Sequence, residues 1–187
     1  MRTLLVKLLL PVILLPSLAA AAKPAGWFLA GSDPSAYEIE RDAGALRDGK
    51  SSGRLASIRE SKGFGTMMQS FDSADYKGKR LRLSAWVKAK DVKRWAGVWM
   101  RVDGESGGSL AFDNMQSRPI VGTKDWTRYE VVLDVAPNSK AIAFGILLDG
   151  EGSVWLNDVQ FEVVDASVPV TGNPAQGRKP ANLNFEK

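Results

Sequence analysis

The 187-residue chain contains no cysteine and no histidine. Without cysteine there is no disulfide, no thiolate nucleophile and no cysteine-ligated zinc site. Without histidine there is no imidazole base, no serine-histidine-aspartate triad and no histidine-ligated metal. Carboxylate pairs and metals bound through oxygen ligands remain open. These absences favour a binding protein over an enzyme.

Long apolar runs are also absent, apart from one near the start of the chain. Residues 1–22 combine basic Arg2 and Lys7 with a short apolar run, Leu8–Leu15, and then the small-residue sequence SLAAAA. This pattern predicts a signal peptide cleaved near Ala22, and therefore a periplasmic or secreted protein. A retained membrane anchor is the alternative, but the run is short and is broken by two prolines. We expect no stable membrane span after cleavage.

An excess of one charge is lacking too. The formal net charge is +4, and removing Arg2 and Lys7 with the signal leaves 23 basic against 21 acidic residues, or +2. Such a balance gives little attraction to a polyanion, so we expect no nucleic-acid partner. We interpret the basic clusters at 77–82 and 88–94 as solvated strand edges, with acidic polysaccharide or anionic lipid as the alternative partner.

Three short segments between residues 80 and 115 alternate between apolar and polar side chains. They span 80–90, 97–104 and 110–114. Alternation with a period of two predicts half-buried strands, each with one face on a core and the other in water. In the third segment this places Leu110 and Phe112 on the core face.

The solvent-facing side of these strands carries aromatic rings among hydrogen-bonding groups. The candidate ligand-binding residues are Trp86, Trp99, Arg101, Asp113 and Asn114, with Trp95 beside them in a predicted loop. Indole rings stack on the C–H faces of sugars, while guanidinium, carboxylate and amide groups bind hydroxyls. The alternative is that loops cover the tryptophans, that Trp95 serves as a hinge or packing residue, and that Arg101 and Asp113 form a surface ion pair.

The rest of the chain predicts further strands and no helix outside the signal. They lie near residues 37–41, 53–60, 66–71, 126–135, 141–150 and 150–164. Residues 141–150 place Ala143, Gly145 and Leu147 on a face with little bulk, and the last strand changes phase near Asn157, which predicts a bulge. We therefore predict an all-β fold, an antiparallel β-sandwich formed by one domain at 23–164. Residues 165–187 read as a Pro/Gly/Asn-rich linker and C-terminal tail.

Four stretches resemble, in order, segments of the galactose-binding-like jelly-roll family, which includes many carbohydrate-binding modules. They are DGKSSGRLAS, RLRLSAWVKA, DWTRYEVVLDV and VWLNDVQFEVV, and together they cover about residues 37–164. The resemblance implies a jelly-roll β-sandwich and a carbohydrate ligand. The strings WAGVWMRVDG and AFDNMQ resemble a bacterial subgroup in which some members are described as transcription regulators, although this chain shows no helix-turn-helix pattern.

The same resemblance implies a possible structural Ca²⁺ ion, and we expect that no cofactor is required. Its ligands would be carbonyl groups near Lys50 and Ser52 and the side chain of Asp158, which could equally cap a bulge. The matching glutamate, Glu186, lies at the other end of the chain within the string NLNFE at 182–186. In the family such a string forms an opening strand. Here it would either begin a following module or supply an extra edge strand, within the chain or to a second copy in a homodimer.

The sequence therefore predicts an exported, non-catalytic binding module for a carbohydrate or a similar polar ligand. A structural or partner-docking module of the cell envelope is the first alternative. A jelly-roll hydrolase or lyase acting on glycans is the second, because a pair of carboxylates can hydrolyse glycosides. The carboxylates in or beside loops are Asp103, Glu105, Asp113 and Asp149.

Overall fold

A computed structural model describes residues 22–172, which form nine β-strands and two three-residue 3-10 helices. The strands are β1 (Phe28–Gly31), β2 (Tyr37–Arg47), β3 (Lys50–Ser57), β4 (Phe64–Asp72), β5 (Arg80–Gly104), β6 (Ser109–Asp113), β7 (Ile120–Asp134), β8 (Ser139–Asp149) and β9 (Ser153–Val164). The helices are η1 (Pro34–Ala36) and η2 (Ala74–Tyr76). In this described part of the chain, no helix has the length and apolar character needed to cross a bilayer. The predicted signal up to residue 21 and the tail at 182–186 lie outside the described residues.

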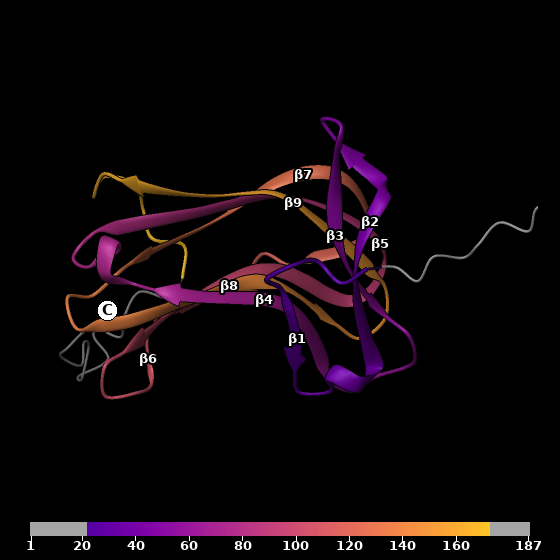
Figure 1. Cartoon of the computed structure of the whole chain (residues 1–187), viewed down its shortest axis with the longest axis horizontal. Helices are drawn as coiled ribbons and strands as arrows, with labels where there is room; N and C mark the ends of the chain where they lie inside the picture. The colour runs from indigo at the N-terminus through magenta and orange to yellow at the C-terminus, as the bar shows by residue number, and fades with distance from the viewer. Residues whose placement is uncertain (1–21, 173–187) are drawn as a thin grey trace, which may run out of the picture.

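The strands form an antiparallel sheet that folds over into two layers, as Figure 1 shows. Layer 1 has the order β1-β4-β8-β5-β6, and layer 2 has the order β2-β3-β9-β5-β7. Strand β5 belongs to both layers because its first half pairs with β7 and β9, whereas its second half pairs with β8 and β6. This is the predicted all-β, antiparallel sandwich.

Strand β5 is longer than the sequence predicted. Residues 80–90 and 97–104 were expected as two strands with a loop between them, but the structure joins them into one strand of 25 residues. The chain bends within the connecting segment, where Asp91 has φ of 54° and the pairing with β7 shifts register. Irregularities of this kind turn a strand without ending its ladder of hydrogen bonds.

The core between the layers consists of the side chains that the alternation in β5 predicted. Leu81, Leu83, Val98 and Met100 are almost completely buried, and Ile146 on β8 packs into the same cluster. Each such side chain contributes about 1.5–3 kcal/mol relative to its exposed state. The alternation therefore sets which face of each layer remains outside.

Strand β6 has the opposite phase from the one predicted. Leu110 is 38% exposed and Phe112 is 46% exposed, whereas Ala111 packs against the core and Asp113 is buried. The β5–β6 pairing is irregular beyond Val102, so the strand meets β5 with its small residue turned inward. Because β6 is a short edge strand, this phase leaves Phe112 on the outer face of layer 1.

The sequence made one prediction for β9 and another for the residues that follow it, and the structure treats the two differently. The predicted bulge is confirmed, because Asp158 has φ of 50° and the register against β5 shifts at this point. The residues after β9, predicted as linker, lie along the domain at first. Arg80 Nη1 donates to the carbonyl oxygens of Ala166 and Val168, both at 2.6 Å, and Thr171 N donates to Val132 O at 3.0 Å.

Candidate functional site

A groove crosses the outer face of layer 1. Ala143 and Gly145 face outward on β8, as the sequence predicted, and the Trp99 indole packs over them. The hollow beside this indole has a volume of about 640 Å³. Aromatic and aliphatic side chains surround it, with a few polar groups among them: Phe64, Met68, Trp95, Trp99, Phe112 and Leu147, with Lys62, Thr66, Arg101, Asn114 and Asp149. We term it the Trp95 groove. A concave, mostly apolar surface with a few polar groups is typical of sites for small ligands.

Trp99 is built into this groove. Its neighbour across the ladder is Gly145, which has no side chain, so the indole reaches over β8 and donates from Nε1 to Thr66 Oγ1 at 2.8 Å. The ring packs with Ala143 and Leu147, and only 6% of the residue is exposed. The sequence placed Trp99 on the correct face, but neighbouring side chains cover most of it. The Trp99 indole therefore forms part of the groove wall and leaves little surface for contact with a ligand.

Trp95 is the more accessible of the two rings. It lies at one end of the groove, in β5 and not in the predicted loop, and it is half-buried. Its Nε1 donates to Asp149 Oδ2 at 3.1 Å, and Arg94 holds the other carboxylate oxygen of Asp149 at 2.6 Å. Because the indole nitrogen is bound to a carboxylate that Arg94 holds in turn, the orientation of the indole is fixed and its remaining contact surface is the ring itself.

Arg101, Phe112 and Asn114 stand at the other end. Arg101 pairs with Phe112 across the β5–β6 ladder and donates to both carboxylate oxygens of Asp103, at 2.7 and 3.0 Å. The Phe112 ring meets Trp99 edge to face, with centroids 6.4 Å apart. Alternation alone could not assign Phe112 to this site, because either face of so short a strand fits the pattern.

Asp113 does not face the groove. Its carboxylate is buried and accepts hydrogen bonds from both terminal nitrogens of Arg118, from Thr171 Oγ1 and from the backbone N of Met115. Burial raises the pKa of this carboxyl, but the hydrogen bonds and the Arg118 charge outweigh it, so the pKa lies below its ordinary value. The ion pair considered with Arg101 is not formed, and Asp113 instead locks three segments of chain together.

Trp86 lies in the other layer. Because β5 passes from layer 2 to layer 1 between them, Trp86 and Trp99 are on outer faces of different layers. The guanidinium of Arg47 stacks over the Trp86 ring at 3.8 Å from its centroid, a cation–π contact with the β2–β3 hairpin. The structure thus gathers Trp95, Trp99, Arg101 and Asn114 and separates Trp86 from them.

The loop predicted to hold Ca²⁺ is occupied by an amide of the chain. Asn157 Nδ2 donates to the carbonyl oxygens of Lys50 and Ser51, both at 3.2 Å, and to Ser52 Oγ at 3.0 Å. A cation there would need these oxygens as its own ligands. The side chain of β9 that faces the loop is therefore Asn157, and not Asp158.

Asp158 is turned to the surface. Its carboxylate accepts a hydrogen bond from Gln160 Nε2 at 3.0 Å and lies 3.6 Å from Arg47 Nη1. Among the described residues, no three acidic side chains come together as a group that could hold a metal ion. The donors around the loop fit Ca²⁺ poorly, and the calcium site stays a prediction that a chelator test decides.

We expect EDTA to leave the thermal midpoint of the protein unchanged, and Asn157→Ala to lower the free energy of unfolding by about 1–3 kcal/mol. The variant leaves the oxygens of Lys50 and Ser52 without their donor. Gln160→Ala, an exposed amide on the same strand, is the matched control and should change stability little. A midpoint that falls with EDTA in the unaltered protein and recovers with added CaCl₂ would establish the metal site.

The four carboxylates of the catalytic alternative are each engaged by a basic side chain. Asp103 pairs with Arg101, Glu105 with Lys77, Asp113 with Arg118 and Asp149 with Arg94. A glycosidase needs one protonated carboxyl as acid and one free carboxylate as base or nucleophile. Of the four, Asp113 has a pKa below its ordinary value, which does not suit the acid.

Comparison with known proteins gives one relative in sequence. No protein-family model matches the chain. Over 170 residues it is 46% identical to a protein of Bacillus subtilis (strain 168) described as the uncharacterized HTH-type transcriptional regulator YbfP; the match covers 88% of this chain and 58% of that protein. The chain thus spans less than two thirds of its relative. A helix-turn-helix requires two α-helices, and residues 22–172 contain none.

Solved structures show similarity in fold. The CBM22-1 xylan-binding domain of Paenibacillus barcinonensis Xyn10C matches with a TM-score of 0.55 and 16% identity, over 78% of this chain and 90% of that one. The enzymatically active domain of bacteriophage CBA120 tailspike protein 4 matches with a TM-score of 0.56 and 17% identity, over 75% of this chain and 20% of that one. The chain therefore has the galactose-binding-like jelly-roll fold of carbohydrate-binding modules, as its motifs implied. Domains of this fold occur in binding modules and also within enzymes.

Proposed function

We propose that the protein is an exported, non-catalytic module that binds a carbohydrate, or a similar polar ligand, in the Trp95 groove. One observation carries this proposal. The groove presents Trp95 and Phe112 beside Arg101 and Asn114, on a fold shared with carbohydrate-binding modules. The predicted signal peptide supports export to the periplasm or the medium.

The available groups suit a sugar that lies across the strands. The rings of Trp95 and Phe112 would contact the C–H faces of the sugar, since the Trp95 nitrogen is already bound to Asp149 and Phe112 has no polar side-chain atom. Arg101 uses Nε and one terminal nitrogen on Asp103, which leaves Nη1 to donate to a hydroxyl. Asn114 uses Oδ1 to accept from Gln116 N, which leaves its NH₂ group for the ligand.

We expect the purified protein to bind at least one glycan on an array of neutral and acidic oligosaccharides. Trp95→Ala and Phe112→Ala should each weaken calorimetric binding of that oligosaccharide by about tenfold or more, because aromatic anchors carry much of the energy of a binding surface. Leu46→Ala is the control and should bind normally, because it also removes an exposed apolar side chain but does so on layer 2, away from the Trp95 groove. No array signal above background would contradict the proposal.

The two alternatives give different results in the same experiments. A partner-docking module would give no glycan signal but would dimerise with concentration, and deletion of residues 181–187 would abolish the dimer. A hydrolase or lyase would release shorter products from the bound glycan. The C-terminal tail on which the first alternative rests lies outside the described residues.

A further inference from the structure

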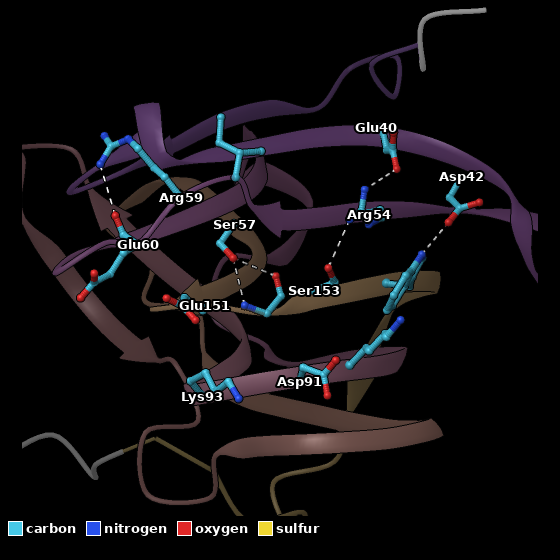
Figure 2. Close-up of a pocket in the computed structure, with 14 residues that line it drawn as sticks. Glu40, Asp42, Arg54, Ser57, Arg59, Glu60, Asp91, Lys93, Glu151 and Ser153 are labelled. Atoms are coloured by element: carbon cyan, nitrogen blue, oxygen red, sulfur yellow. Dashed lines mark hydrogen bonds and ion pairs between the residues drawn. The ribbon is translucent and has the colours of Figure 1, made fainter. Parts of the chain in front are cut away.

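A second groove lies on the outer face of layer 2. It has a volume of about 660 Å³ and is bounded by β2 and β3 on one side and by the bend of β5 on the other. Figure 2 shows Glu40, Arg54 and Asp42 along one side and Asp91 and Lys93 along the other. Trp155 lines this groove, and we term it the Trp155 groove.

The Trp155 ring is held in place from its edge. Val154 and Leu156 point into the core, so Trp155 points outward from β9 and is half-buried. Its Nε1 donates to Asp42 Oδ2 at 2.7 Å, while Asp42 Oδ1 accepts from the backbone N of Gly44 at 2.8 Å. Since the only polar atom of the indole is satisfied by the protein, the ring offers a ligand an apolar platform in a fixed orientation.

Planar polar groups surround that platform. Arg54 is the cross-strand neighbour of Trp155, and its guanidinium carbon lies 5.8 Å from the ring centroid. Glu40 Oε1 accepts from Arg54 Nη1 at 2.7 Å, and Ser153 Oγ accepts from Arg54 Nη2 at 3.3 Å. These contacts fix the guanidinium over the indole at this distance, where it can donate to a group that contacts the ring.

The two signs of charge are nearly balanced around the groove. The basic side chains are Arg54, Arg59, Lys90 and Lys93, and the acidic ones are Glu40, Asp42, Glu60, Asp91 and Glu151. A groove with such a balance does not select an anion or a cation. It does suit hydroxyl groups, because each hydroxyl both donates and accepts a hydrogen bond.

Trp86, another tryptophan on this layer, has a ring face that the protein itself covers. Trp86 is covered by the guanidinium of Arg47, which sits directly over the ring at 3.8 Å. The guanidinium of Arg54 also lies over its ring, but its carbon is 5.8 Å from the Trp155 centroid, against 3.8 Å for Arg47 and Trp86. The protein's own cation thus covers Trp86 closely, whereas the more distant contact at Trp155 accompanies a groove that this ring lines.

We propose that the Trp155 groove is a second carbohydrate-binding site, and that its ligand is a neutral oligosaccharide. Trp155 would stack against one sugar ring, Arg54 would donate to its hydroxyls, and Glu40 would accept from them. The site is independent of the Trp95 groove, because the two grooves lie on different layers and share no lining residue.

Indole N–H signals in ¹H–¹⁵N NMR spectra test this proposal directly, since the chain has six tryptophans. The probes are xylohexaose, cellohexaose and chitohexaose, each added to about 10 mM. We expect at least one of them to shift the Trp155 Nε1–H signal in a saturable manner. The signal is assigned by its loss in Trp155→Phe.

Matched variants separate the two grooves. Trp155→Ala and Arg54→Gln should each weaken binding at this site by about tenfold or more. In Trp95→Ala the Trp155 signal should still shift. If that signal stays fixed with all three probes, or moves only when Trp95 is intact, the second site is overturned, whatever the Trp95 signal does. Movement at Trp95 alone would leave the proposed function standing.

Discussion

Arg118→Ala should lower the free energy of unfolding by about 3 kcal/mol. Asp113, its partner, has a side chain that is only 5% exposed, so the variant leaves a carboxylate in the interior without its counter-charge. The Arg118 side chain is itself 34% exposed, which places the expected loss at the lower end of the range for buried pairs. Urea denaturation followed by tryptophan fluorescence measures the change.

The same pair predicts how stability depends on pH. The pKa of Asp113 lies below its ordinary value in the folded protein, so the folded state favours the ionised carboxylate. Its contribution is fully present above the unfolded pKa of about 3.9 and is lost as the pH falls through the folded value. We therefore expect a shallower loss of stability on acidification in Asp113→Asn than in the unaltered protein.

Arg82→Ala is the matched control for Arg118→Ala. It removes another arginine that pairs with a carboxylate, but its partner Glu162 is 58% exposed, so the expected loss is below about 1 kcal/mol. Equal losses of unfolding free energy in the two variants would show that the burial of Asp113 adds nothing to the stabilisation by its ion pair. That result would contradict the locking role assigned to this carboxylate.

Trp99→Ala should cost about 3–5 kcal/mol, since it removes a large side chain that is 94% buried and leaves a cavity under the Trp95 groove. Trp99→Phe should cost less, about 1–3 kcal/mol, because it keeps most of the ring but leaves Thr66 Oγ1 without its donor. Thermal and urea denaturation measure both. The variant Trp99→Ala is consequently a test of stability, and a poor test of ligand contact.

Trp95→Ala provides the contrast. Trp95 packs at the end of the same groove but is only half-buried, so we expect a smaller loss of stability than in Trp99→Ala and a larger relative effect on binding. If Trp99→Ala unfolded no more easily than Trp95→Ala, then the indole of Trp99 would have to be accessible after all. The sequence-based expectation of an open Trp99 would then regain its support.

The sequence predicted the fold well because alternation reports directly on burial. Leu81, Leu83, Val98 and Met100 alternate with polar residues, and all four are in the core. The change of phase near Asn157 likewise identified a real bulge. In both cases the pattern is local, since it needs only the side-chain period of a strand.

The composition of the site was harder to predict because it depends on how distant strands meet. The bend of β5 places Trp86 and Trp99 on different layers, and nothing within residues 91–97 marks it as a bend rather than a loop. Asp113 is paired with Arg118 and accepts a hydrogen bond from Thr171, which is 58 residues away in the sequence. Phe112 lines the Trp95 groove because the alternation of the short edge strand β6 has the phase opposite to the predicted one.

The passage of β5 through both layers has a mechanical consequence. In a sandwich whose layers touch only through side chains, tension on one face can peel that layer from the other. Here peptide bonds run without a break from the pairing with β9 to the pairing with β8. A load applied to either face would enter the same strand and spread into hydrogen bonds on both sides of it.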